Sequence, residues 1–436
     1  MAPTFVTQLF NSIADTGREL LDLRGDKKRN NSIKGLCRDL LTQKGEASGM
    51  ALARDAVAAW NTLTEEEKLD FLYFLNEEMA PDQVEIEKAV AAYHKQADAK
   101  NYKALTTAIE APRQELMRRL NFAPGGTAAI VAMRKFLVGH LRTNPELKAV
   151  DSDLQHLLSS WFNRGFLTLE RIDWRTPAVV LEKLIEYEAV HEIDGWDDLR
   201  RRLDKDRRCF AFFHPALPDE PLIFVEVALV KGLASAIPPL LARETERGDP
   251  TKADTAIFYS ISNCQDGLKG ISFGNFLIKQ VVAELSAELP NLKHFATLSP
   301  IPGFMRWLNG VQGAVAGMHF KELREIRDLI SEKGWQQNPE IVEKVKGPLE
   351  HLCAHYLVNE KSGERPLDPV TRFHLGNGAR LEQLNWLGDD SENGMKQSAG
   401  LLVNYYYSLR DIEKNHEAYA NERKVVASSA IQSLAK

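Results

Sequence analysis

The chain has 436 residues, of which 44% are hydrophobic and 27% charged, values typical of a globular protein with about two domains. A formal net charge of −6 argues against a nucleic-acid partner, because nucleic-acid-binding domains are usually basic. No apolar run approaches the roughly 20 residues of a membrane-spanning helix, so we expect no membrane partner.

Cysteine usage and the chain termini indicate a cytoplasmic protein. The four cysteines are far apart and show no paired spacing, which favours reduced thiols over a disulfide framework or a zinc site. They are Cys37, Cys209, Cys264 and Cys353. The first residues include Asp15 and Glu19 and few arginines, unlike a signal or transit peptide. The last residues are not the Ser-Lys-Leu peroxisomal address.

Residues 1 to about 155 are predicted to form amphipathic helices. Thr64 and Glu67 make a capping box before apolar residues at helical spacing. Ser152 and Gln155 suggest a second capping box. Consecutive amphipathic helices predict a bundle, and we find no catalytic group of residues in it. We therefore expect residues 1–155 to serve assembly. The basic cluster at 24–29 is interpreted as a solvated loop, with a nucleic-acid patch as the alternative.

Strands begin to alternate with helices after residue 156. A helix is predicted over 179–190, and the mixed charge run at 200–208 is interpreted as a solvated face, with a role in binding an acidic coenzyme tail as the alternative. Residues 209–213 and 221–230 are rich in β-branched and aromatic residues and predict two strands joined by a proline-containing turn.

The central stretch combines a strand, a glycine loop, a helix and a second strand. The strand is predicted over 255–262 and the helix over 276–285, with a second strand at 295–298 that ends at Ser299. Free N–H groups and the helix dipole make a helix N-terminus approached through glycines a favourable anion site. The pattern therefore indicates a phosphate cradle beside a polar pocket.

The C-terminal third is predicted to be mostly helical. Residues 312–358 have helical spacing, and a hairpin is expected from 372–375 and 379–386 with a turn at Gly376-Asn377-Gly378. The tail from 398 to 435, including its tyrosine run, is predicted to be helical again.

These motifs together resemble the malonyl-CoA decarboxylase family. The resemblance extends over roughly residues 157–407. Its motifs lie at residues 256–262, 267–270, 274–279, 298–304, 372–375, 377–379, 385–386 and 404–405. It implies an α+β protein: an N-terminal all-helical bundle domain (1–155) and an acetyltransferase-like mixed-sheet α/β catalytic domain (156–436). It also implies malonyl-CoA as substrate and a homotetramer.

The glycine loop is the candidate coenzyme site. In the acetyltransferase fold, the resemblance implies, the amides of this loop hold the pyrophosphate of the coenzyme. Lys269 takes the basic position of the motif and Gly274 the last glycine, whereas Ser272 replaces the first glycine. From the residues alone, a plain turn is the alternative. The candidate residues are Lys269, Gly270, Ile271, Ser272, Phe273, Gly274 and Asn275.

Three residues are candidates for the chemistry. Ser299 precedes a proline, which favours an extended backbone, and the resemblance places it on the family's catalytic serine, described as the proton acceptor. His374 matches the family's proton donor, and its unperturbed pKa of about 6.5 suits proton delivery near neutrality. Tyr407 is a candidate for the same pocket. Purely structural roles are the alternatives. His351 and His355 share a helical face but lack a third metal ligand, and we interpret them as structural.

The implied reaction is decarboxylation of malonyl-CoA to acetyl-CoA and CO₂. The thioester carbonyl serves as the electron sink, so no metal and no separate cofactor is expected. The protein must bind the coenzyme, stabilise the enolate and deliver a proton to carbon, which we assign to the Ser299/His374 pair. The alternatives are an acyl-CoA-dependent acyltransferase on the same fold and a non-catalytic acyl-CoA sensor.

Overall fold

The computed structural model describes residues 5–23, 32–43, 45–244, 246–271 and 277–436, which fold into two compact units. The helical unit comprises residues 1–167, 214–220 and 265–272, and the sheet unit comprises 168–213, 221–264 and 273–436. The basic cluster at 24–29 is outside the described residues. Among the described helices, none has both the length and the hydrophobicity needed to cross a bilayer.

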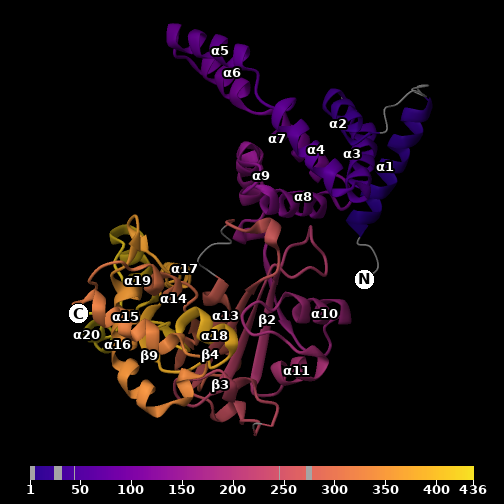
Figure 1. Ribbon diagram of the computed structural model, residues 1–436. Helices are drawn as coiled ribbons and strands as arrows, with labels where there is room; N and C mark the ends of the chain where they lie inside the picture. The colour runs from indigo at the N-terminus through magenta and orange to yellow at the C-terminus, as the bar shows by residue number, and fades with distance from the viewer. Residues whose placement is uncertain (1–4, 24–31, 44, 245, 272–276) are drawn as a thin grey trace. The chain divides into compact units, whose positions relative to one another are not determined.

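The helical unit confirms the predicted N-terminal helices (Figure 1). Thr64 caps its helix as expected, accepting a hydrogen bond from Glu67 N while the Glu67 side chain accepts one from Thr64 N. The helices are α1 (Phe5–Leu23), α2 (Ile33–Thr42), α3 (Glu46–Thr62), α4 (Glu65–Glu77), α5 (Gln83–Lys95), α6 (Ala99–Ile109), α7 (Pro112–Asn121), α8 (Gly126–His140) and α9 (Lys148–Trp161), with short 3-10 turns η1 (Pro145–Leu147), η2 (Arg164–Phe166) and η4 (Asp266–Leu268).

The second capping box is wrong, because Ser152 lies inside a helix. The turn η1 runs directly into α9, which begins at Lys148, four residues before the predicted cap. A proline at the first position of η1 supplies the start signal, since its fixed φ suits a first turn and its missing N–H is not needed there.

Helices α5 and α6 pack side by side and bury little of their apolar surface (Figure 1). Ala89 is the buried residue of α5 and no described residue of α6 is buried, whereas Val84, Tyr102 and Ile109 are more than half exposed. Exposed apolar residues on a helix pair are compatible with the assembly role expected for residues 1–155. Oligomerisation stays a prediction.

A buried arginine of α8 holds the start of the predicted coenzyme loop. Arg134 is 2% exposed, pairs with Asp151 at 2.8 Å, and donates from Nη1 to the carbonyl oxygens of Gly267 (2.8 Å) and Lys269 (2.9 Å). A Cβ on Gly267 would lie 2.1 Å from the carbonyl oxygen of Val131, so only glycine permits this approach. The helical unit therefore fixes the backbone at 267–269.

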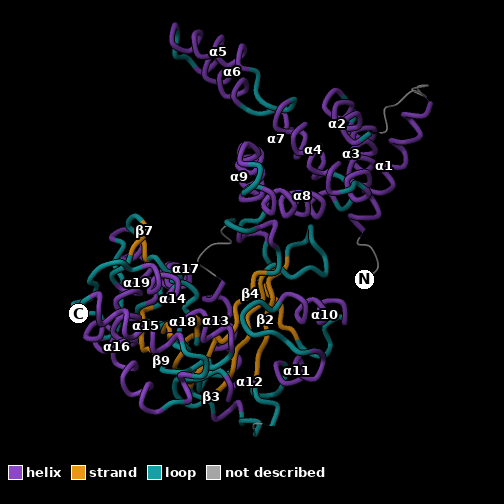
Figure 2. The backbone as a smooth tube through the Cα atoms, in the orientation of Figure 1, coloured by secondary structure: helices purple, strands orange, loops and turns teal. Residues whose placement is uncertain are grey.

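The sheet unit is built on a mixed sheet, eight-stranded in the described part of the chain (Figure 2). Its strand order is β1-β2-β3-β4-β5-β10-β6, with β9 also paired to β10. The strands are β1 (Thr168–Ile172), β2 (Arg207–Phe213), β3 (Ile223–Val230), β4 (Thr255–Asn263), β5 (His294–Thr297), β6 (Ser299–Pro300), β9 (Arg380–Asn385) and β10 (Leu402–Tyr406), and a separate pair is formed by β7 (Lys361–Ser362) and β8 (Arg365–Pro366).

Helices pack on this sheet to complete the core. The helices are α10 (Ala178–Tyr187), α11 (Gly195–Arg202), α12 (Pro238–Leu241), α13 (Leu277–Glu288), α14 (Phe304–Gly310), α15 (Phe320–Ser331), α16 (Pro339–Val358), α17 (Pro369–Gly376), α18 (Glu392–Ser398), α19 (Ile412–Glu422) and α20 (Ser429–Leu434), with turns η3 (Pro250–Lys252) and η5 (Trp335–Gln337). Leu184 of α10 and Leu199 of α11 pack with Phe224 of β3 in one core cluster.

Strands β4 and β5 are the parallel pair, and α13 connects them. A parallel pair needs such a crossover connection, so the predicted strand–helix–strand unit is confirmed. The expected order, a helical N-terminal region followed by a mixed-sheet α/β region, is confirmed as well.

Two predictions for the C-terminal third are wrong. Residues 372–375 belong to helix α17, not to a hairpin strand, because Asp368 accepts a hydrogen bond from Thr371 N (2.8 Å) and Pro369 occupies the first helical position. The tyrosine run lies at strand β10, which pairs with β5, β6 and β9, and not in a helix. A strand buried on both faces has no polar alternation, which hides it from periodicity.

The charge run at 200–208 is not a solvated face. Arg201, Arg202, Arg207 and Arg208 are all buried. Arg202 pairs at 2.7 Å with Glu226, a fully buried residue of β3, and Arg208 pairs at 2.7 Å with Glu288. Partners distant in sequence make this burial tolerable, because a buried charge needs a hydrogen-bonded counter-charge.

Replacing Arg134 with alanine should destabilise the protein by about 3 kcal/mol, because Asp151 loses its partner and two carbonyl oxygens lose their donor. Urea unfolding measures the change. Arg142→Ala, at an exposed arginine beyond α8, is the control and should stay within about 0.5 kcal/mol of the parent. A decrease in the free energy of unfolding of less than about 1 kcal/mol for Arg134→Ala would refute the stabilising role assigned to the Arg134 contacts.

Candidate functional site

The sheet unit contains a cavity of about 270 Å³ at the point where Ser299 and His374 meet. Most lining side chains are apolar, with polar groups at a few places, which is the usual construction of a small-molecule site. The lining residues are Val190, Ile223, Val225, Phe258, Tyr259, Ser260, Ile261, Asn263, Leu277, Ile278, Leu298, Ser299, Pro300, Pro369, Val370, Phe373 and His374.

Ser299 is held at the start of the short strand β6. Its backbone pairs with Val403 of β10, and the residue is 6% exposed. The Ser299 hydroxyl donates to Thr297 Oγ1 at 2.8 Å and lies 3.2 Å from His374 Nε2. Backbone pairing and two side-chain contacts therefore fix the hydroxyl at the cavity wall.

His374 lies in the last turn of α17 and is 3% exposed. Its Nδ1 is 2.7 Å from the Tyr407 hydroxyl, so both ring nitrogens have a hydroxyl partner. The imidazole also stacks on the ring of Tyr405, with centroids 4.3 Å apart and an interplanar angle of 25°. The Tyr405 hydroxyl bonds to Thr371 of the same helix at 2.7 Å. These contacts leave the imidazole one orientation.

The hydrogen bonds fix one direction along the chain of side chains. Since Ser299 donates to Thr297, it is free to accept from His374 Nε2–H. A neutral imidazole then accepts at Nδ1, and the donor there is the Tyr407 hydroxyl. We call this Tyr407→His374→Ser299→Thr297 sequence the hydroxyl–imidazole chain.

Burial sets the protonation states in this chain. It lowers the pKa of His374 to about 3 and raises the pKa of Tyr407 well above its usual value. Both groups are therefore neutral near pH 7. The expectation that His374 delivers its proton with an unperturbed pKa of about 6.5 is wrong for the substrate-free protein, because no counter-charge offsets its desolvation.

The structure describes part of the candidate coenzyme loop. Lys269 and Gly270 are exposed, Ile271 is buried, and Gly270 has φ of 81°, a left-handed conformation that favours glycine. These three residues belong to the helical unit, whereas Ser299, His374 and Tyr407 belong to the sheet unit. The remaining predicted residues are outside the described part of the chain; they are Ser272, Phe273, Gly274 and Asn275.

The sequence reasoning missed Thr297 and misread Tyr405. Residues two apart on a strand lie on the same face, so a strand prediction for the tyrosine run would have placed Tyr405 and Tyr407 together. The same spacing relates Thr297 to Ser299. This relation follows only once the strand is known, because the buried tyrosine run shows no polar alternation from which to predict it.

A buried carboxylate behind the cavity wall was missed as well. Ser260, which lines the cavity, bonds through its hydroxyl to both oxygens of Glu188 at 2.8 and 2.7 Å. Glu188 also accepts from Ser262 (3.1 Å) and from the backbone N–H groups of Val190 and His191. These donors satisfy the charge without a cation and keep Ser260 fixed.

The described residues contain no cluster of three or more His, Cys, Asp and Glu side chains suited to a metal ion. His351, one of the paired histidines, has its two ring nitrogens 2.6 Å and 2.7 Å from the carbonyl oxygens of Leu434 and Ala316. This side chain connects three segments of the sheet unit.

His374 should make the protein less stable as the pH falls. Its folded pKa of about 3 lies below the unfolded value of about 6.5, so the unfolded state binds more protons between these values. The contribution is complete above pH 6.5 and should fall by about 2 kcal/mol between pH 7.5 and pH 5. Urea unfolding of the parent and His374→Gln at both pH values isolates it, since His191, with a pKa lowered by burial to about 4, stays in both proteins. Equal pH losses in parent and variant would contradict the assignment.

Comparisons with known proteins agree with this architecture. Residues 165–436 match the Malonyl-CoA decarboxylase C-terminal domain and residues 79–162 the Malonyl-CoA decarboxylase N-terminal domain. The mitochondrial malonyl-CoA decarboxylase of Anser anser anser is 39% identical over 344 residues, covering 73% of this chain and 68% of that protein. That of Rattus norvegicus is 37% identical over 344 residues, covering 73% and 70%.

Solved structures show the same relationship. The crystal structure of malonyl-CoA decarboxylase from Rhodopseudomonas palustris has a TM-score of 0.89 and 50% identity, covering 92% of this chain and 98% of that chain. The one from Agrobacterium vitis has a TM-score of 0.86 and 50% identity, covering 93% and 99%. The family domains, the sequence identity and the shared fold together show that the chain belongs to the malonyl-CoA decarboxylase family.

Proposed function

We propose that this chain is a carboxy-lyase that converts malonyl-CoA to acetyl-CoA and CO₂ with its own side chains. The observation that carries the proposal is the hydroxyl–imidazole chain, which brings Ser299 and His374 together at the wall of a mostly apolar cavity, with Tyr407 hydrogen-bonded behind His374. Family membership supplies the substrate class. An apolar site with a few fixed donors suits a reaction whose charge moves from a carboxylate to an enolate oxygen.

The reaction begins with Ser299. Its hydroxyl turns from Thr297 to the malonyl carboxylate and fixes the bond that breaks. When the carbon–carbon bond breaks, CO₂ leaves, and the electron pair delocalises onto the thioester carbonyl as an enolate. The Ser299 hydroxyl then lies beside the carbon that CO₂ has left.

The hydroxyl–imidazole chain supplies the proton that completes acetyl-CoA. Ser299 passes its proton to carbon and receives one from His374 Nε2–H, while Nδ1 receives the Tyr407 proton, which water restores. An enolate carbon is a much stronger base than a tyrosinate, so neutral donors are sufficient. His374 is therefore able to act as the proposed proton donor although burial keeps its imidazole neutral.

The predicted loop at 269–275 is proposed to bind the coenzyme pyrophosphate. Arg134 donates to the carbonyl oxygens of Gly267 and Lys269, at the start of this loop, which supports a fixed entry to the proposed coenzyme site.

Incubation with malonyl-CoA alone, followed by mass spectrometry of the products, tests the activity. Acetyl-CoA and CO₂ in equal amounts, without any acceptor, are expected. A requirement for an amine or alcohol acceptor would show an acyltransferase, and binding without turnover would show an acyl-CoA sensor. Either result would overturn the proposal.

Ser299→Ala and His374→Ala should each lower kcat by a factor of about 10² to 10⁴, the usual contribution of a positioned acid–base group, while malonyl-CoA binding persists. The double variant should lose much less than the product of the two single losses, because groups acting as a unit are not additive. Circular dichroism and unfolding of each variant control for folding. Folded single variants with parental rates would refute the mechanism.

The pH dependence of kcat/KM distinguishes a neutral donor from an imidazolium. This quantity reports the pKa values of the free enzyme, and His374 in the free enzyme titrates near pH 3. We therefore expect kcat/KM to be constant between about pH 5.5 and 8, where the neutral form stays fully populated. A change centred near pH 6.5 that His374→Gln abolishes would show that the imidazole titrates normally and would exclude this proton route.

A further inference from the structure

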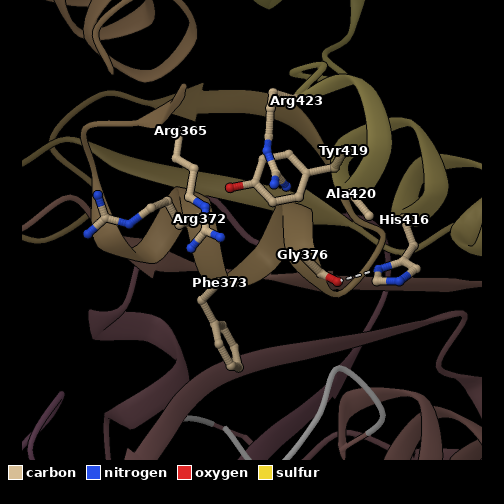
Figure 3. A pocket seen from close by; sticks show the side chains of 8 residues that line it. All are labelled: Arg365, Arg372, Phe373, Gly376, His416, Tyr419, Ala420 and Arg423. Atoms are coloured by element: carbon tan, nitrogen blue, oxygen red, sulfur yellow. Dashed lines mark hydrogen bonds between the residues drawn. The ribbon is translucent and has the colours of Figure 1, made fainter. Parts of the chain in front are cut away.

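A second pocket of the sheet unit borders helix α17, the helix that carries His374 (Figure 3). Its volume is about 330 Å³, and its walls come from α17, α19 and the strand β8. The lining residues are Arg365, Arg372, Phe373, Gly376, His416, Tyr419, Ala420 and Arg423. No residue of the hydroxyl–imidazole chain lines it.

Three arginines make the pocket strongly positive. In Figure 3 the side chains of Arg365 and Arg423 lie beside the Tyr419 ring, whereas the Arg372 guanidinium points away from it; none of the described lining residues is a carboxylate. Burial raises the pKa of Tyr419, and the positive charges of all three arginines oppose that shift, so each of them lies within electrostatic range of the phenol. The neighbouring Glu364 is 85% exposed and 3.9 Å from Arg423, a geometry that neutralises little.

The pocket is preorganised. Arg372 Nη1 donates to the carbonyl oxygens of Pro366 (3.0 Å) and Leu367 (3.1 Å), which fixes its guanidinium. Arg423 follows the last residue of α19 with φ of 54°, a left-handed position where helices usually end in glycine. His416 Nδ1 bonds to the Gly376 carbonyl oxygen at 2.7 Å and ties α19 to α17 (Figure 3). Arg423 thus places its positive charge at a pocket wall whose two helices, α17 and α19, are already held together.

We propose that this pocket binds a phosphoryl group. Guanidinium groups pair with phosphate oxygens through two parallel hydrogen bonds, and the charges of Arg365 and Arg423 together balance a doubly charged phosphomonoester, with Arg372 adding positive charge nearby. Tyr419 adds aromatic surface beside the charges, which suits a phosphate carried on a ring-bearing molecule such as a nucleotide. A carboxylate ligand carries only one charge and would leave most of the positive charge uncompensated.

Two sources can supply this phosphoryl group. Phe373 lines both this pocket and the Ser299 cavity, so one ligand is the 3′-phosphorylated adenosine end of the coenzyme A thioester. This source rests on the proposed function. The other source is free phosphate or a separate phosphorylated molecule, which would act on α17 and requires no turnover of malonyl-CoA.

Calorimetric titration of the full chain with coenzyme A, 3′-dephospho-coenzyme A and inorganic phosphate tests the proposal. Arg423→Gly removes one guanidinium and introduces the residue best suited to φ of 54°, so loss of fold does not explain its effects. Arg365→Gln removes an exposed charge of the same pocket. Arg324→Gln, at an exposed arginine of α15 outside the pocket, is the matched control.

If the coenzyme is the source, the parent and Arg324→Gln bind coenzyme A about tenfold or more tightly than 3′-dephospho-coenzyme A, as expected for charge-assisted hydrogen bonds. In Arg423→Gly and Arg365→Gln that preference falls to less than about threefold. If a separate phosphate is the source, the two coenzymes bind equally to every protein, and only inorganic phosphate binding is lost in the pocket variants.

Pocket variants that bind all three probes like the parent would overturn the proposal. None of these titrations requires turnover, so they are independent of the decarboxylase assignment. A chain that binds phosphate through these arginines but does not decarboxylate malonyl-CoA would refute only the proposed function. A chain that decarboxylates malonyl-CoA without any arginine-dependent binding would refute only this inference.

Discussion

The geometry of the candidate site depends on the side chain of Thr297. This residue lies where the direct pairing of β10 with β5 ends and its pairing with β6 has not yet begun. Strand β10 pairs with β5 at Tyr406 and with β6 at Val403, and between these points side chains replace the ladder. Thr297 Oγ1 accepts from the backbone N–H of Tyr405 (3.2 Å) and from Ser299, while Asn404 Nδ2 donates to the Thr297 carbonyl oxygen (2.7 Å). The buried backbone groups stay satisfied although the strands separate, which leaves Ser299 at an opening and not inside a continuous sheet.

The burial of His374 at this opening determines its charge. A site that buries an imidazole without a carboxylate partner keeps it neutral, and the two hydroxyl partners of His374 stabilise one tautomer. In the proposed mechanism, a permanent cation at this site would stabilise the malonyl carboxylate in the ground state and slow its loss as neutral CO₂. In the same proposal, neutral donors interact more weakly with the carboxylate and remain in position to stabilise the enolate after the charge has moved.

The sequence permitted prediction of the central strand–helix–strand unit, because its periodicity and glycines are local signals. It did not permit prediction of the secondary structure around His374. The helix start at Asp368 depends on a cap that the hairpin interpretation overlooked, and strand β10 is buried on both faces. The buried charges of Arg202 and Glu226 depend on a contact across 24 residues, which no local pattern reveals. Ser299 and His374 were predicted through motif resemblance, and their 3.2 Å contact is a property of the fold.

Helix α17 connects the two pockets in a single turn. Arg372, Phe373 and His374 are consecutive, so their side chains diverge by about 100° per residue and reach different surroundings. Arg372 lines the second pocket, Phe373 lines both pockets, and His374 completes the hydroxyl–imidazole chain. A ligand that moves Arg372 would therefore move the backbone of α17 two residues from His374. Because the stacked Tyr405 ring and the Tyr407 hydroxyl allow that imidazole one orientation, small shifts of α17 would act first on the distance between His374 and Ser299.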